Sequence, residues 1–197
     1  MSVTLWVLLA LAVVVLIWAV GVYNRLAQLR NRMANAFGQI DVQLKRRYDL
    51  IPNLVEVARG YLQHEASTLQ AVIEARGQAQ GAAAVARAAP TNAGAVSGLS
   101  MAEGVLGASL GRLMAVSERY PELKADATMQ QLSEELASTE NRVGFARQAF
   151  NDQVLDFNNA AQQFPTLIVA RLAGFAPAAV LAATQSDEER RAPRVEF

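Results

Sequence analysis

The sequence contains no cysteine and only one histidine, His64. The missing cysteines exclude disulfide bonds, thiolate zinc sites and a cysteine nucleophile. A single histidine argues against a Ser-His-Asp triad and against a di-iron bundle site, which needs two histidines. Basic and acidic residues number 18 each, so net charge does not favour nucleic-acid binding. We therefore expect a non-enzymatic protein with no cofactor and no nucleic-acid partner.

Charged side chains are also absent from residues 3–22, a run of Leu, Val, Ala, Ile and Trp. As a helix this run would rise about 30 Å, which is the thickness of the hydrocarbon core of a bilayer. Trp6 and Trp18 lie near its two ends, and Tyr23 follows it, as is typical of membrane interfaces. A cleaved signal peptide is the alternative, but no basic residue precedes the run. We predict a single transmembrane helix over residues 3–22, after a short flank at residues 1–2.

Three arginines, Arg25, Arg30 and Arg32, follow the apolar run before the first acidic residue, Asp41. The positive-inside rule then places the N-terminus outside and the body in the cytoplasm. The same arginines would lie close enough to the bilayer to contact anionic lipid, which makes the lipid bilayer an expected partner. They could equally serve as a topology signal alone.

The rest of the chain shows helical periodicity. Apolar residues recur every three or four positions from the end of the apolar run to Leu44, which predicts that one helix leaves the membrane as a stalk. Pro52 is expected to kink or restart this helix. A second regular stripe runs from Leu132 to Phe164. The predicted fold is all-α, with a transmembrane helix continuous with a long antiparallel bundle of three to four helices over residues 23–175.

Other segments are less regular. Residues 77–97 are rich in alanine and glycine and are expected to form a mobile loop. Ser100 and Glu103 have the spacing of a capping box, which would begin a short helix. Pro121 suits the first turn of the last long helix. Residues 176–197 are expected to form an extended or disordered tail.

The densest charged cluster adjoins the proline. It is a candidate partner contact, and the proline is a candidate hinge. A solvated face or ion pairs with the last helix, and a capped helix restart at the proline, are the interpretations that the sequence favours. The candidate interaction or hinge residues are Lys45, Arg46, Arg47, Tyr48, Asp49, Pro52 and Asn53.

Several segments together resemble the LemA family. They are residues 23–26, the sequence Asp-Val-Gln-Leu-Lys-Arg-Arg-Tyr-Asp-Leu-Ile-Pro-Asn-Leu-Val at 41–55, residues 140–158 and the tail at 189–197. The chain departs from the family pattern at residues 164–167 and at Val180-Leu181. The resemblance implies a single-pass protein of the bacterial inner membrane with a helical bundle and a short N-terminus outside. It supplies no catalytic residues.

A self-assembling scaffold or membrane-organising protein is the function that these features favour. Gly104, Gly107 and Gly111 would permit close approach of a neighbouring backbone, which favours a homo-oligomer. Other membrane proteins are possible partners. The alternatives are a peptide- or cofactor-binding membrane protein and an accessory factor of a membrane protease or export system.

Overall fold

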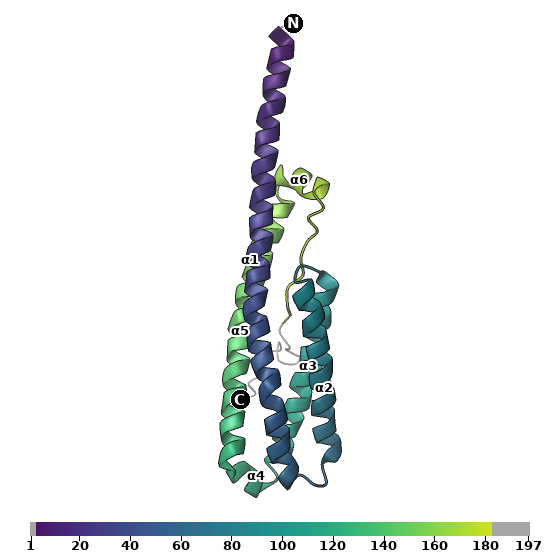
Figure 1. Cartoon of the computed structure of the whole chain (residues 1–197), viewed down its shortest axis with the longest axis vertical. Helices are drawn as coiled ribbons and strands as arrows, with labels where there is room; N and C mark the ends of the chain where they lie inside the picture. The colour runs from purple at the N-terminus through teal and green to yellow at the C-terminus, as the bar shows by residue number, and fades with distance from the viewer. Residues whose placement is uncertain (1–2, 183–197) are drawn as a thin grey trace, which may run out of the picture.

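The computed structural model describes residues 3–182, so the predictions for residues 1–2 and 183–197 lie outside it. Every regular element in this range is a helix, and the all-α prediction is confirmed. The helices are α1 (Val3–Tyr61), α2 (Ala66–Ala88), α3 (Ala93–Ser117), α4 (Pro121–Ala125), α5 (Ala127–Gln162) and α6 (Thr166–Leu172). Four long helices pack as an antiparallel bundle, and α1 projects far beyond it toward the N-terminus (Figure 1).

Helix α1 is a single element of 59 residues. No residue of its first third is buried, whereas a buried stripe at helical spacing begins at Leu26 and continues through Met33, Phe37 and Ile40. The apolar run therefore passes into the bundle core without a break, as the sequence predicts. A helix of this length spans about 88 Å.

The predicted restart at Pro52 is wrong, because α1 continues through it to Tyr61. A proline within a helix cannot donate to the carbonyl four residues earlier, which here belongs to Tyr48. Nε of Arg76, from α2, donates a hydrogen bond of 2.6 Å to that carbonyl oxygen. A side chain from the next helix thus replaces the missing backbone donor, and Pro52 itself is exposed.

The loop predicted over residues 77–97 is also wrong. Helix α2 runs to Ala88, and α3 begins at Ala93 with the Asn92 side chain accepting a hydrogen bond from the backbone of Ala95 at 3.0 Å. Alanine favours helix, and its small side chain lets α2 and α3 pack closely. The buried seam of α2 is correspondingly Ala75, Ala79, Ala83 and Ala86.

Two further boundaries differ from those expected. Ser100 and Glu103 lie inside α3 and cap nothing. Pro121 begins the short helix α4, and the last long helix, α5, begins after Asp126, whose side chain accepts from the backbone of Met129 at 2.9 Å. Asparagine and aspartate at these N-caps supply the acceptors that the first turns need.

The hairpin of α2 and α3 is shorter than the pair formed by α1 and α5 (Figure 1). Near the loop that joins α2 and α3, Arg87 binds Asp41 of α1 through two contacts of 2.8 and 2.7 Å. Beyond this level, toward the N-terminus, α1 packs against α5 and α6. The molecule is therefore thick at the end distant from the apolar run and narrow next to it.

Replacing Arg76 by alanine should lower the free energy of unfolding by about 1.5–3 kcal/mol, because it leaves the Tyr48 carbonyl without a donor. The loss should shrink in a Pro52→Ala background, in which residue 52 regains its own N–H. Denaturant unfolding of the full-length protein in detergent, followed by circular dichroism, measures both. Arg59→Ala, at an exposed position of α1, is the control; equal losses in the two backgrounds would contradict the account.

Candidate functional site

The structure separates the predicted cluster around Pro52 into two groups. Arg47 and Tyr48 are buried, whereas the other five side chains are exposed: Lys45, Arg46, Asp49, Pro52 and Asn53. Of the exposed cations, Arg46 makes a loose contact of 3.9 Å with Glu135 of α5. The helix does not begin here, so Asp49 and Asn53 have no cap to supply.

A buried polar cluster joins three helices at this level. Nη1 of Arg47 lies 2.6 Å from a carboxylate oxygen of Glu103 in α3, and its Nη2 lies 3.0 Å from Glu140 in α5. The Tyr48 hydroxyl donates to the other oxygen of Glu103. Side chains of Arg47 and Glu103 are only 7% and 11% exposed, while Glu140 reaches solvent. The predicted ion pairing with the last helix is therefore present, and α3 contributes the more buried partner.

Burial sets the electrostatics of this cluster. It raises the pKa of the Glu103 carboxyl, although Arg47 and the Tyr48 hydroxyl act in the opposite direction. Burial, together with the negative charge of Glu103, also raises the pKa of Tyr48 well above its ordinary value. The phenol therefore stays protonated at neutral pH and serves as a donor. Arg47, Tyr48, Glu103 and Glu140 hold one another in place through these contacts, so the cluster stabilises the packing of the three helices.

One polar atom of the cluster is unsatisfied. Within the described part of the chain, Nε of Arg47 is buried without a hydrogen-bond partner. A cavity of about 20 Å³ is lined by Arg47 together with Arg147, Leu181 and other residues. This volume is enough for one water molecule, which would supply the missing acceptor.

Residues 175–182, which follow α6, form an extended segment that lies between the α1–α5 pair and the α2–α3 hairpin (Figure 1). Asn158 of α5 exchanges two hydrogen bonds of 2.9 Å with the backbone N–H and C=O of Ala178. Asn151 does the same with Leu181, at 2.8 and 3.1 Å. The described part of the predicted tail is thus extended, but it is held against the bundle.

The spacing of these two asparagines matches the segment they hold. Seven residues of helix rise about 10.5 Å, and three residues of extended chain span about 10 Å. Side chains of Ala178 and Leu181 are buried beneath the segment. We call the surface of α5 that holds this segment the asparagine groove. It was not predicted from the sequence, although Asn151 and Asn158 lie seven positions apart on one helix and therefore share a face.

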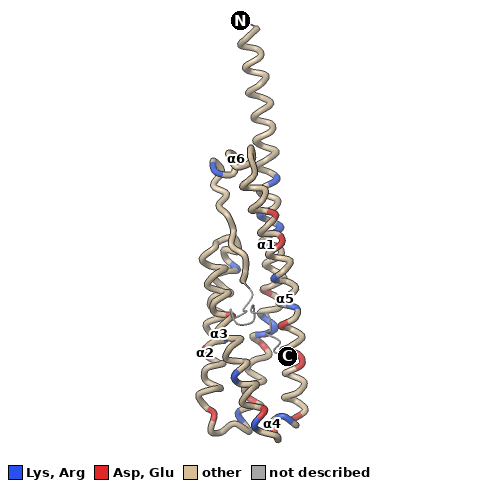
Figure 2. The backbone as a smooth tube through the Cα atoms, turned by 180° about the vertical axis from the view of Figure 1, so that it is seen from behind, with Lys and Arg blue, Asp and Glu red and all other residues tan. Residues whose placement is uncertain are grey.

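Arginines gather near the end of the apolar run (Figure 2). Arg25 and Arg32 line an open pocket of about 550 Å³ with Asp156 and polar side chains of α5. Arg30 instead lies over the ring of Phe175, 5.4 Å from its centroid. The three predicted lipid-proximal residues thus occupy two different surroundings, just below the exposed part of α1.

Two of the three glycines predicted to allow close helix packing, Gly107 and Gly111, make no tight contact with the residues that the structure describes. A Cβ built at Gly107 or Gly111 would meet no atom within 4 Å. Gly104 and Gly107 are half-buried and Gly111 is exposed on α3. Among residues 3–182, no three His, Asp or Glu side chains come together in a way that could hold a metal ion.

The sequence pattern of the LemA family matches residues 36–197. The chain belongs to the LemA family. The match includes the buried Arg47–Tyr48–Glu103 cluster and both groove asparagines, so these features lie in the part of the chain that defines membership.

Relatives of this LemA-family chain include magnetosome proteins. Magnetosome protein MamQ of Magnetospirillum gryphiswaldense is 34% identical over 82 residues, which is 42% of this chain and 30% of that protein. Magnetosome protein MamQ 2 of Paramagnetospirillum magneticum is 32% identical over 74 residues, 38% of this chain and 27% of that protein. The matched region therefore spans under a third of the length of these relatives.

Within residues 3–182, two helices are long and apolar enough to cross a membrane, α1 and α3. The apolar window of α3 is 33% buried in the bundle, whereas that of α1 is wholly unburied and lies at the N-terminus. Together with the family and its magnetosome relatives, this exposed run makes the chain a membrane-associated helical protein.

Removing either buried partner, by Arg47→Met or Glu103→Met, should cost about 3–5 kcal/mol, because the other charge is left buried. The double substitution should cost about 1–3 kcal/mol less than the sum of the two. The exposed pair of Arg87 and Asp41 provides the matched control, with an expected coupling below about 1 kcal/mol. Denaturant unfolding measures the four free energies of each cycle; additive losses for Arg47 and Glu103 would refute the coupling.

Proposed function

We propose that this chain is a non-enzymatic, membrane-anchored scaffold that assembles with copies of itself. The observation that carries the proposal is the continuity of α1, a single helix whose start is exposed and apolar and whose remainder forms the core of the bundle. No linker separates the two parts, so the anchor and the body behave as one rigid post. Such a post would hold the bundle at a fixed position relative to the membrane.

The location that we propose is the bacterial inner membrane. Residues 3–22 cross it once, with the N-terminus outside. Arg25, Arg30 and Arg32 follow the span at once, which favours a cytoplasmic body by the positive-inside rule. Arg25 and Arg32, beside an open polar pocket, are well placed for the phosphates of anionic lipid.

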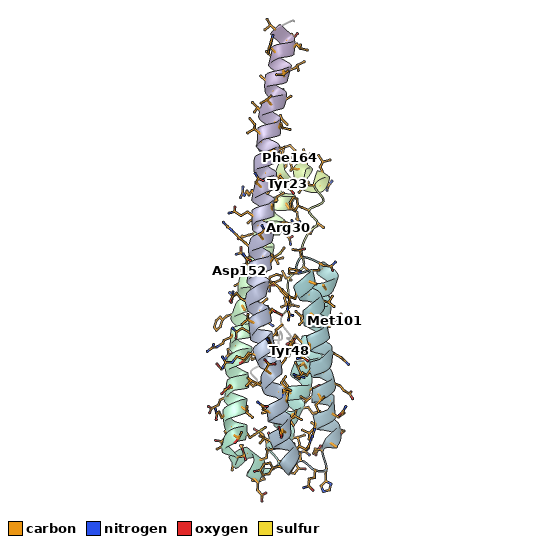
Figure 3. The ribbon with its side chains drawn as sticks, in the orientation of Figure 1. Tyr23, Arg30, Tyr48, Met101, Asp152 and Phe164 are labelled. Carbon is orange, nitrogen blue, oxygen red and sulfur yellow. The ribbon has the colours of Figure 1, made fainter. Side chains whose placement is uncertain are left out.

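Self-assembly is supported by an apolar strip on the outside of α3. Met101 and Val105 lie one turn apart and are 67% and 51% exposed. Gly104, Ala108 and Gly111 follow the same face at helical spacing, and small residues permit close approach of a second helix. A second copy is the occupant that fits, because two such strips are complementary to each other in size and polarity. Met101 is labelled in Figure 3.

The full-length protein in detergent should run as a particle of several copies in size-exclusion chromatography with light scattering, after subtraction of bound detergent. Met101→Gln combined with Val105→Gln should reduce it toward a monomer, because two apolar contacts at the interface are lost. Val85→Gln, at an exposed position of α2, is the matched control. A monomer for the unchanged protein would remove the self-assembly proposal.

A second candidate is a peptide-binding role, and the two asparagines of the groove favour it. They contact backbone atoms alone, so the same four hydrogen bonds are open to any extended chain with small or aliphatic side chains at the buried positions. The tail of this chain would then be the resident occupant, which a partner's segment displaces.

A labelled peptide with the sequence of residues 175–182 should bind a protein shortened to residues 1–174, in which no resident segment competes for the asparagines. Asn158→Ala should weaken this binding about tenfold, because two hydrogen bonds of about 0.5–1.5 kcal/mol each are lost. Asn159→Ala, at the exposed neighbouring position, should leave it unchanged. Fluorescence polarisation measures all three, and equal affinities for the two variants would exclude recognition by Asn158.

A further inference from the structure

Helix α6 and the turn before it expose an apolar face. Phe164 in the turn is 82% exposed, and Ile168 and Leu172, one turn apart on the helix, are 52% and 85% exposed. The opposite side of α6 is buried, with Ala170 at 1%. A short helix with one face packed on the protein and three large apolar side chains in the open is unusual at a surface in contact with water.

The position of α6 along α1 indicates that the bilayer covers the apolar face of α6. Ala170 belongs to a small core with Leu26, Ala160 and Ala161, and Val22 packs against the same core. Val22 is the last residue of the uncharged apolar run, and Leu26 lies only four residues, about 6 Å of helix, beyond it. Helix α6 is therefore beside α1 where α1 leaves the bilayer. Figures 1 and 3 show it at the end of the bundle that faces the anchor, with Phe164 near the level of Tyr23.

The surroundings of α6 have the composition of a membrane interface. The ring of Tyr23 lies 5.6 Å from that of Phe175, which follows α6, and the guanidinium of Arg30 lies over the same Phe175 ring. Arg171 is exposed on α6 itself. Aromatic rings and arginines at one level are typical of the headgroup region. Interfacial helices lie with their apolar side about 5–10 Å inside that region.

We propose that α6 and Phe164 form a second membrane contact, in which Phe164, Ile168 and Leu172 enter the headgroup–acyl boundary of the bilayer that α1 crosses. The inference rests on the proposed anchor and does not depend on self-assembly. One rod through a bilayer is free to tilt and rotate about its axis. A second contact from α6 fixes both, so the bundle holds one orientation relative to the membrane plane.

The absence of cysteine from the sequence allows a direct test. Single cysteines at Phe164, Ile168 and Leu172 are labelled with an environment-sensitive fluorophore in the full-length protein. The proteins are reconstituted into nanodiscs of phosphatidylcholine and phosphatidylglycerol that contain lipids spin-labelled at a shallow or a deep acyl position. Phe145→Cys is the control for an equally exposed apolar site on α5, at 75% exposure, and Val14→Cys is the control for the anchor.

Labels at positions 164, 168 and 172 should be quenched at least threefold more than the label at position 145, and more by the shallow than by the deep spin label. Val14 should be quenched most by the deep label. If Val14 is quenched and all three α6 positions behave as Phe145 does, the α6 contact is refuted while the anchor stands. If Val14 is not quenched either, the anchor itself fails. Copy-to-copy cross-linking at position 172 without quenching by lipid would show that a second copy covers this face and would also overturn the inference.

Discussion

The whole arrangement depends on α1 remaining one helix across Pro52. The proline leaves the Tyr48 carbonyl without its intrahelical donor, and a helix interrupted there would separate the upper stalk from the lower core. Arg76 donates to that carbonyl from α2, so the continuity of the first helix requires the second to be packed against it. The rigid post is consequently a product of the folded bundle and does not follow from the intrinsic stiffness of its own sequence.

The polar cluster beside this contact sets the register of the other helices. Arg47 reaches Glu103 on α3 and Glu140 on α5, and Tyr48 adds a hydrogen bond to Glu103. Two helices that meet through apolar side chains alone can shift by one turn relative to each other at little cost. A buried ion pair opposes such a shift, because the shift would leave its charges buried and unpaired. The raised pKa of Glu103 shows that burial is expensive here. Arg47 and the Tyr48 hydroxyl offset part of this cost, because both act to lower the pKa of Glu103.

Sequence periodicity was enough to predict the long helices with large side chains. Most residues of the two stripes are buried as expected, because spacings of three and four are intrinsic to a helix. Phe164, expected at the end of the second stripe, lies beyond the end of α5 and is 82% exposed. The prediction of a loop over the alanine seam of α2 was wrong. Alanine occurs on exposed and on buried helix faces alike, so the seam can be recognised only once the neighbouring helix is known. Glu103 was assigned to a cap because local spacing suggested it, and its true partners lie 55 and 56 positions away. The asparagines at 151 and 158 bind backbone, which leaves no trace in the side chains of the bound segment.

The unequal lengths of the two helix pairs give the molecule a tapered outline: α1 stands alone toward the N-terminus, α5 and α6 pack beside it further along, and all four long helices pack together at the far end. If copies meet side by side through their broad ends, their anchors must stand apart by the width of a whole four-helix body. Lipid then fills the space between neighbouring spans.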